Sequence, residues 1–235
     1  MLCKIADLMV EIPATGGMAS RCREYLTEEN VSADIVIRAE RYKTERWVNL
    51  TEDQAIYMES GNQFYRSLLN YDGLMLHASA VELDGKAYLF SGPCGMGKST
   101  HTRLWKEIFG DKANVFNDDK PALRRIDDTW FAYGTPWCGK DGININMKVP
   151  LAGICFLKRG EKNIIRQLSQ TEAAFSIISQ TVRKFKLSED LDKMLKLAES
   201  VAGRIPVYEL YNRPEPEAAR ISYETMRQGA KEALL

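Results

Sequence analysis

A glycine-rich segment at residues 91–100 constrains the fold more than any other part of the chain. Its sequence, SGPCGMGKST, fits the pattern G-x-x-x-x-G-K-[ST], in which glycines let backbone N–H groups turn toward phosphate oxygens. Residues 87–90 form a short apolar run suited to a buried strand, and residues 99–109 carry apolar side chains at helical spacing. The sequence therefore predicts a strand, a phosphate-binding loop and a helix in direct succession, with the positive end of the helix facing the phosphates.

The positions of this loop have separate tasks in binding a nucleotide. Lys98 is expected to reach the outer phosphates, and the Ser99 hydroxyl is expected to bind magnesium. ATP and Mg²⁺ are therefore the expected cofactors, while GTP and pyrophosphate stay open as alternative phosphoryl donors. The predicted nucleotide-binding residues are Gly92, Pro93, Cys94, Gly95, Met96, Gly97, Lys98, Ser99 and Thr100.

An acidic pair, Asp118-Asp119, follows Lys98 by about 20 residues, at the end of a short apolar run that predicts a strand. One carboxylate can hold magnesium, directly or through water, while the other accepts a proton from an attacking hydroxyl. Asn and Asp are also favoured in turns, so a solvated turn is the alternative. Beside a phosphate loop, the pair favours the metal and base interpretation.

The two histidines, His77 and His101, have different expected roles. His77 is predicted in a strand at residues 76–80, one strand before the loop, where it could polarise a phosphate or contact the metal. A structural role is the alternative, because a lone strand histidine is often a packed residue. His101 lies in the first turn of the predicted loop helix, which favours a packing or capping role.

Several further residues are candidates for chemistry near the phosphates. Residues 133–140 are a candidate acceptor or lid loop, because Trp137 offers an aromatic surface and Lys140 a donor. A structural turn with Trp137 packed into the core is the alternative. Lys140, Lys158 and Arg159 could each neutralise charge on the transferred phosphoryl group. An oxidation switch at Cys94, inside the loop, is a further hypothesis.

Composition excludes several classes of protein. The chain of 235 residues is long enough for one large domain, and its apolar fraction of 45% excludes general disorder. Its 32 basic and 32 acidic residues cancel, so neither nucleic acid nor a membrane is an expected partner. Five cysteines without a C-x-x-C pair argue against a disulfide framework. Acidic Asp7 and Glu11 stand where a signal peptide would have its apolar core, so we expect a cytoplasmic protein.

Turn signals predict how the strands are paired. Asp84-Gly85 and Asp127-Asp128 each separate two apolar runs, which is typical of β-hairpins. Because hairpins pair strands antiparallel, a purely parallel sheet is disfavoured. We expect an α/β fold with a mixed, strand-rich sheet around the phosphate loop and helices outside it. Residues 1–50 are predicted to form a small α+β portion, and residues 51–235 a nucleotide-binding, kinase-like domain.

The order of the histidine strand, the glycine-rich loop and Asn117-Asp118-Asp119 resembles the P-loop phosphotransferase superfamily of HPr kinase/phosphorylase and phosphoenolpyruvate carboxykinase. The likeness covers residues 74–160 and implies the fold of the HPr kinase C-terminal domain. Thr100 stands where HPr kinase usually has an acidic residue, and a later signature with a magnesium-binding glutamate is not found. Reverse phosphorylase activity therefore stays open, and the carboxykinase reaction is not expected.

The resemblance implies roles for residues that the motifs already single out. It implies that Asp118 accepts the proton, that Ser99 and Asp119 bind magnesium, and that Lys98 and His77 complete the catalytic group. The expected reaction is Mg²⁺- and ATP-dependent phosphoryl transfer to a hydroxyl, such as a serine of a small protein or peptide. A small-metabolite kinase and a non-catalytic, nucleotide-binding regulatory module are the alternatives. Relatives in this family are oligomeric, which leaves a homo-oligomer open.

Overall fold

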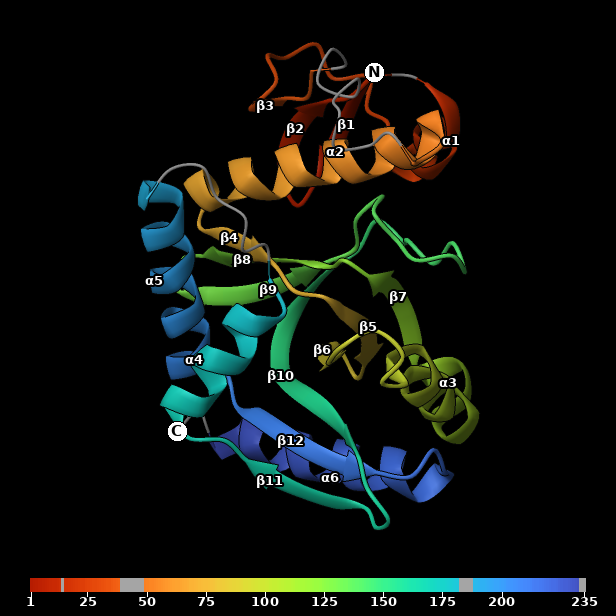
Figure 1. Cartoon of the computed structure of the whole chain (residues 1–235), viewed down its shortest axis with the longest axis vertical. Helices are drawn as coiled ribbons and strands as arrows, with labels where there is room; N and C mark the ends of the chain where they lie inside the picture. Colours follow the sequence, from red (N-terminus) through yellow and green to blue (C-terminus); the bar gives the residue numbers. More distant parts are fainter. Residues whose placement is uncertain (14, 39–48, 182–187, 233–235) are drawn as a thin grey trace.

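The structure is a computed structural model, and it describes residues 1–13, 15–38, 49–181 and 188–232. Within these residues the strands form a small N-terminal sheet and a larger main sheet, and helices flank both (Figure 1). The architecture is mixed α/β with a curled, strand-rich main sheet, as the turn signals and apolar runs predict. The small sheet lies at one end of the molecule, at the top in Figure 1.

The main sheet is organised around one long strand. Its members are β4 (Gly73–Met75), β5 (Ala78–Leu83), β6 (Lys86–Ser91), β7 (Asn114–Asp119), β8 (Ala122–Ile126), β9 (Thr129–Tyr133), β10 (Lys148–Arg159), β11 (Ile164–Gln167) and β12 (Val207–Asn212). The order is β4-β8-β9-β10-β6-β5-β7, with β12 beside β10 and β11 beside β12. The first residues of β10 pair antiparallel with β9, and its later residues pair parallel with β6 and β12. β10 therefore joins an antiparallel half to a half that contains parallel pairs.

Both predicted hairpins are present. β5 pairs antiparallel with β6 across Asp84-Gly85, where φ is +53° and +72°. β8 pairs antiparallel with β9 across Asp127-Asp128, where φ is +45° and +66°. Positive φ at both turn residues gives the backbone twist that two-residue hairpins require, and Asp and Gly tolerate it best.

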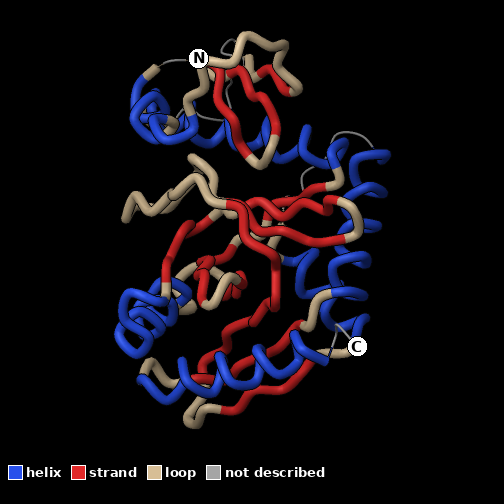
Figure 2. Tube along the Cα trace, turned by 180° about the vertical axis from the view of Figure 1, so that it is seen from behind, coloured by secondary structure: helices blue, strands red, loops and turns tan. Residues whose placement is uncertain are grey.

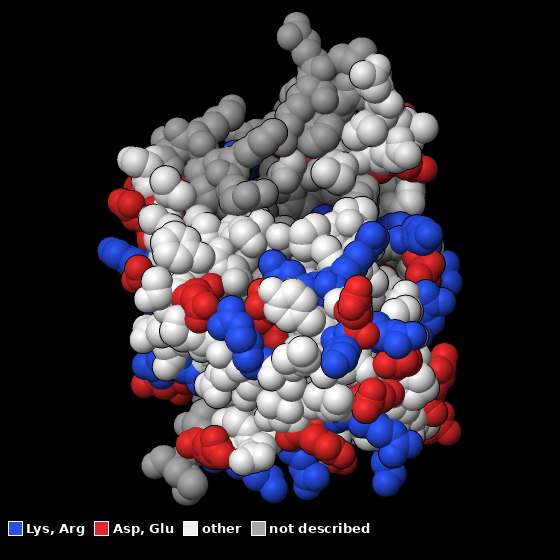
Figure 3. Space-filling view, turned by 60° about the horizontal axis from the view of Figure 1, so that its bottom comes forward, with Lys and Arg blue, Asp and Glu red and all other residues white. Residues whose placement is uncertain are grey.

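Helices cover the main sheet from two sides (Figure 2). α3 (Lys98–Phe109) packs against α6 (Pro216–Glu232), and α4 (Gln170–Ser179) packs against α5 (Ser188–Arg204). Single-turn 3-10 helices occur at Arg23–Tyr25, Leu69–Tyr71 and Gly110–Lys112. None of the helices in the described part of the chain is long and apolar enough to cross a membrane. Figure 3 shows basic and acidic side chains interspersed on one face, in keeping with a net charge of zero.

The N-terminal portion shares its core with the rest of the molecule. β1 (Leu2–Ile5) and β2 (Leu8–Glu11) form a hairpin, β3 (Ile35–Val36) pairs with β2, and α1 (Gly16–Arg21) packs against α2 (Glu52–Leu68). One buried cluster joins the side chains of these strands to α2, and it includes Tyr133 and Trp137 from the main body. The division at residue 50 stays a prediction, and α2 lies between the two sheets (Figure 1).

Buried His101 holds α3 against α6. The His101 side chain is 1% exposed, its Nε2 lies 3.0 Å from Ser222 Oγ, and its ring packs on Phe90 with centroids 4.4 Å apart. Trp105, one turn further along α3, donates through Nε1 to the same Ser222 oxygen at 3.0 Å. Burial lowers the pKa of His101 to about 3. The residue has the packing role that its place in the first turn of the helix predicts.

We predict that His101 makes the protein sensitive to acid. The unfolded side chain takes up a proton near its ordinary pKa of 6.5, and the folded one only near 3. The contribution of the neutral, buried ring to the free energy of unfolding is therefore complete above about pH 6.5, and it is lost as the pH falls toward 3. From pH 7 to pH 5 this loss is about 2 kcal/mol, since one proton corresponds to roughly 1.4 kcal/mol per pH unit.

Urea unfolding of the natural protein and of His101→Gln at both pH values measures this loss. Glutamine cannot take up the proton, so the variant should be less stable at pH 7 but should lose about 2 kcal/mol less on going to pH 5. The same loss in both proteins would contradict the role of His101.

Candidate active site

The glycine-rich loop at residues 92–97 connects the end of β6 to the start of α3, as predicted. Gly92, Gly95 and Gly97 have φ of +148°, +77° and +94°, a region in which side chains other than hydrogen are strained. The backbone path of this loop therefore depends on glycine at these three positions. Such a path brings the loop directly to the N-terminal end of α3, where unpaired N–H groups favour an anion.

Lys98 folds back over this loop. Its Nζ donates to the carbonyl oxygens of Gly92 at 3.0 Å and Pro93 at 3.3 Å. Burial lowers the pKa of Lys98, although the carboxylates of Asp119 and Asp118 and the nearby Cys94 oppose this effect. Carbonyl oxygens thus hold the ammonium group at the position where a phosphate oxygen would be a stronger partner.

Ser99 and Asp118 form a direct pair between α3 and β7. The Ser99 hydroxyl lies 3.1 Å from Oδ1 and 2.9 Å from Oδ2 of Asp118, and donates to this carboxylate. Asp118 is 7% exposed, and its main-chain oxygen accepts a 2.6 Å hydrogen bond from Gly139 N–H. The structure therefore joins the loop serine to the first aspartate of the acidic pair.

The second aspartate, Asp119, has a different set of partners. Its Oδ1 lies 3.2 Å from His77 Nε2, and its Oδ2 contacts Lys120 Nζ and lies 3.4 Å from the Tyr57 hydroxyl. Burial alone would raise the pKa of Asp119, but the hydrogen bond from His77 and the charge of Lys120 outweigh it and hold this pKa well below its usual range. Asp119 also has a φ of +102°, which is strained for a residue with a side chain. Strain of this kind concentrates at functional sites.

His77 lies just before β5, outside the strand predicted at residues 76–80. Its backbone N–H donates to Gln180 O at 2.8 Å, and its Nδ1 lies 3.3 Å from Gln180 Oε1. The chain leaves β4, which pairs with β8, and enters β5, which pairs with β6 and β7. Residues 76–77 connect these two halves of the sheet, so the strand predicted at residues 76–80 was wrong at Leu76 and His77. The continuous apolar pattern gave no sign of this break.

Three residues near Asp119 were missed by the sequence analysis. Lys120 Nζ donates to the Tyr57 hydroxyl at 2.9 Å, and that hydroxyl donates to Cys138 O at 2.9 Å. Arg21 Nη1 donates to the same Cys138 oxygen at 3.0 Å. Lys120 follows the acidic pair directly and could have been found from its position. Tyr57 and Arg21 come from distant helices, α2 and α1, and no motif marks them.

The remaining residues that the sequence singled out lie in different parts of the structure. Trp137 is fully buried and stacks on Phe64, with ring centroids 4.7 Å apart, so it offers no aromatic surface for an acceptor and the packed alternative is correct. Lys158 pairs with Glu209 at 3.6 Å. Arg159 reaches the glycine-rich loop, where its Nη2 donates to Gly95 O at 3.5 Å. Cys94 and Lys140 are exposed.

A cavity of about 420 Å³ adjoins the glycine-rich loop, and its lining does not include Ser99 or the acidic pair. The start of α3 and the ends of β10 and β12 form its walls. The residues that give it polar character are Thr100, Arg159, Asn212 and Arg213. The cavity therefore adjoins both the loop and the N-terminal end of α3, and two arginine residues are among those that line it.

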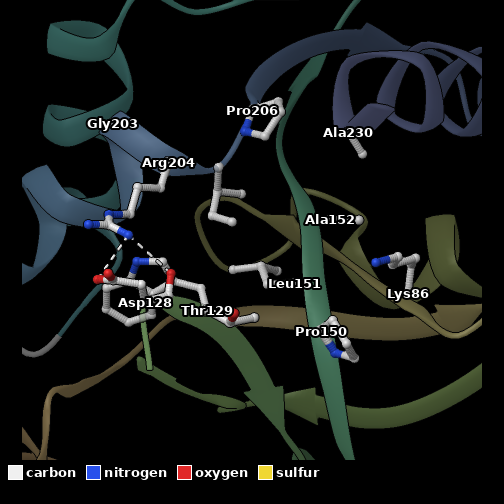
Figure 4. A pocket seen from close by; sticks show the side chains of 12 residues that line it. Lys86, Asp128, Thr129, Pro150, Leu151, Ala152, Gly203, Arg204, Pro206 and Ala230 are labelled. Atoms are coloured by element: carbon white, nitrogen blue, oxygen red, sulfur yellow. Dashed lines mark hydrogen bonds and ion pairs between the residues drawn. The ribbon is translucent and has the colours of Figure 1, made fainter. Parts of the chain in front are cut away.

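A further cavity of about 470 Å³ lies at the opposite end of β6 (Figure 4). Arg204 there donates to Asp128 O and pairs with Asp128 Oδ1, both at 3.1 Å. Lys86, which lines this cavity, begins β6, and the glycine-rich loop follows the last residue of the same strand. Six strand residues span roughly 17–20 Å, so one small ligand cannot occupy both places.

The residues available for a metal ion are few. No group of three or more His, Cys, Asp or Glu side chains in the described ranges is arranged to hold a metal by itself. Ser99 and Asp118 supply one hydroxyl and one carboxylate, which suit an ion that keeps waters and phosphate oxygens as its other ligands.

We predict that Asp119 and Lys120 stabilise each other strongly. Their side chains are about one-quarter exposed, and removal of either one leaves the other charge poorly compensated. A double-mutant cycle with Asp119→Asn and Lys120→Met should give a coupling energy of about 1–3 kcal/mol in urea unfolding. The pair Lys4–Glu29, about half exposed, is the matched control and should give less than about 1 kcal/mol. Equal coupling in both pairs would contradict the compensation of Asp119.

Comparison with known proteins places the chain in a family. A family model, the SynChlorMet cassette protein ScmC, matches residues 41–212, which include the glycine-rich loop, the acidic pair and Tyr57. Among solved structures, an Hpr(Ser) kinase/phosphatase from Coxiella burnetii is similar at 11% sequence identity and a TM-score of 0.37. That match covers 67% of this chain and 95% of the other, and it is too distant to transfer an activity. No curated protein matches the sequence. Since the family model covers most of the chain, the chain belongs to the SynChlorMet cassette protein ScmC family.

Proposed function

We propose that this chain transfers a phosphoryl group from ATP, with Mg²⁺, to a hydroxyl group, such as a serine on a small protein or peptide. The observation that carries the proposal is the pairing of the Ser99 hydroxyl with Asp118 at the end of the glycine-rich loop. A hydroxyl and a carboxylate lie together there at the N-terminal end of α3, and Lys98 is near enough to interact with the charges of Asp118 and Asp119. That combination suits the phosphates of a nucleotide.

Ser99 and Asp118 would hold the Mg²⁺ ion. Serine hydroxyl and carboxylate oxygens are ligands that this ion accepts, while water and phosphate oxygens complete its six positions. When bound, the ion would neutralise part of the negative charge on the phosphates. Lys98 would exchange the carbonyl oxygens of Gly92 and Pro93 for phosphate oxygens, which are stronger partners.

The contacts favour a division of the acidic pair that differs from the one predicted from sequence. From the sequence, Asp118 was expected to accept the proton and Asp119 to bind the metal. Asp118 is paired with Ser99, which supports the metal role, while Asp119 is directed to His77, Lys120 and Tyr57. We therefore propose that Asp119 orients the acceptor hydroxyl and that His77 and Lys120 hold Asp119 in place.

The proposed reaction is a single substitution at phosphorus. The acceptor oxygen forms a bond to the γ-phosphorus, the bond from that phosphorus to the bridging oxygen breaks, and ADP leaves with the electron pair. The proton of the acceptor hydroxyl passes to a carboxylate of the acidic pair and then to water.

The cavity beside the loop supports a nucleoside triphosphate over pyrophosphate as the donor. Its 420 Å³ would be superfluous for a ligand made only of phosphates. Arg159 and Arg213 can stack on a base or pair with the inner phosphate, and Asn212 can hydrogen-bond a ribose or a base edge.

We predict that the Ser99 hydroxyl is required for Mg²⁺-dependent transfer. Ser99→Ala should lower transfer from labelled ATP about 10²- to 10³-fold, because a group that stabilises the transferring phosphates is lost. Ser99→Thr is the matched control and should keep most activity, since the loop pattern accepts either hydroxyl. The measurement is label incorporation in cell extract, separated into macromolecules and metabolites. Undiminished transfer in Ser99→Ala would contradict the metal-binding role of Ser99. Tight ATP binding without turnover would favour a regulatory module.

We also predict that Arg213 contributes to nucleoside binding. Arg213→Ala should weaken ATP binding about tenfold, the loss expected for one exposed guanidinium contact, and should change the affinity for tripolyphosphate much less. Arg204→Ala, in the distant cavity of Figure 4, is the control and should leave both affinities unchanged. Competition against a fluorescent ATP analogue gives both affinities. If ATP and tripolyphosphate bind equally well to every variant, the cavity has no role in donor binding.

A further inference from the structure

The N-terminal portion contains a cavity of about 610 Å³ between α1 and α2. Its apolar wall is formed by Met18 of α1, by Leu50, which precedes α2, and by Met58 of α2. Tyr57 and Arg21 form part of the same lining. Leu50 and Met58 are 37% and 36% exposed, so the apolar wall is open to solvent.

Tyr57 and Arg21 connect this cavity to the acidic pair. The Tyr57 ring lines the cavity, while its hydroxyl lies 3.4 Å from Asp119 Oδ2. Arg21 lines the cavity and donates to Cys138 O, and the next residue along, Gly139, donates its N–H to Asp118 O at 2.6 Å. The guanidinium carbon of Arg21 lies 5.0 Å from the centre of the Tyr57 ring. Tyr57 therefore links the cavity to the carboxylate of Asp119, while the backbone of Cys138 and Gly139 lies between Arg21 and Asp118.

The chemistry of the lining indicates what the cavity accepts. Methionine side chains are unbranched and polarisable, and they adapt to apolar groups of varied shape. Asp53, the carboxylate of the lining, already accepts a hydrogen bond from Gly17 N–H at 3.1 Å. A small polar metabolite would need a partner for each hydroxyl, and this wall offers few. An apolar side chain would find exposed apolar surface on Leu50 and Met58. Arg21 donates to Cys138 through Nη1, and its other N–H groups could donate to a peptide carbonyl.

We propose that this cavity is the specificity subsite for a peptide acceptor. It binds an apolar side chain, such as that of Leu, Met or Phe, located within a few residues of the serine that is phosphorylated. Successive residues of an extended chain advance about 3.3–3.6 Å, so a few residues are long enough to span a distance of one side chain such as Tyr57. The inference rests on the proposed function for the phosphorylated hydroxyl, while the binding of the apolar side chain can be measured without it.

The test uses arrayed peptides with a central serine and one varied residue at each flanking position. The full chain is applied twice, once as fluorescently labelled protein to measure binding and once with labelled ATP and Mg²⁺ to measure transfer. At one flanking position, Leu, Met or Phe should exceed Asp and Lys about tenfold in binding. Met58→Glu should reverse this preference and select Lys or Arg at the same position, because it places a carboxylate in the wall. A reversed preference cannot come from a loss of folded protein.

Leu191→Glu is the matched control, because Leu191 is an apolar helix residue with 41% exposure, on α5 away from the cavity. It should keep the apolar preference. Selective binding that Met58→Glu reverses, without transfer, supports the subsite and overturns the proposed reaction. Transfer whose peptide preference is the same in Met58→Glu supports the reaction and overturns the subsite. The absence of both binding preference and transfer overturns both.

Discussion

The carboxylate of Asp119 requires charged and hydrogen-bonding partners, and several parts of the surrounding structure supply them. A carboxylate withdrawn from water is unstable unless cations or hydrogen-bond donors surround it. Here those partners come from separate parts of the chain, with His77 before β5, Lys120 after β7 and Tyr57 on α2. Each partner has its own support, since Gln180 at the end of α4 holds His77 and Arg21 of α1 packs on Tyr57. The acidic pair is therefore where the main sheet, α4 and the N-terminal portion meet.

The long strand β10 explains how these parts reach one point. Its parallel pairing with β6 places the glycine-rich loop at the same edge of the sheet as its own end near Arg159. Its antiparallel pairing with β9 supports the other half of the sheet. The chain that follows β9 returns to the acidic pair, where Cys138 forms an isolated β-bridge with Asp119. The cavity beside the loop is lined by the start of α3 and the segments that end β10 and β12, whereas the cavity that includes Tyr57 is lined by residues of α1 and α2.

Local sequence patterns predicted the parts of the fold that depend on neighbouring residues. The strand, loop and helix around residues 91–100 followed from glycine spacing and apolar periodicity, and both hairpins followed from Asp-Gly and Asp-Asp turns. The placement of His77 was wrong in detail because an apolar run cannot show where a strand changes its partner. Trp137 was left open between a surface and a core position, since an aromatic residue in a loop fits either.

The sequence by itself determined the glycine-rich loop, the helix that follows it and the mixed α/β class, because backbone conformation and amphipathic spacing act over a few residues. It also singled out the acidic pair and His77 as candidates. Only the tertiary structure decided that Ser99 faces Asp118, that Asp119 faces His77 and Lys120, and that Tyr57 and Arg21 lie between this pair and an apolar cavity. The reason is physical: these contacts join residues far apart in the chain, and they form because a buried charge requires partners from whichever elements the packed core brings near it.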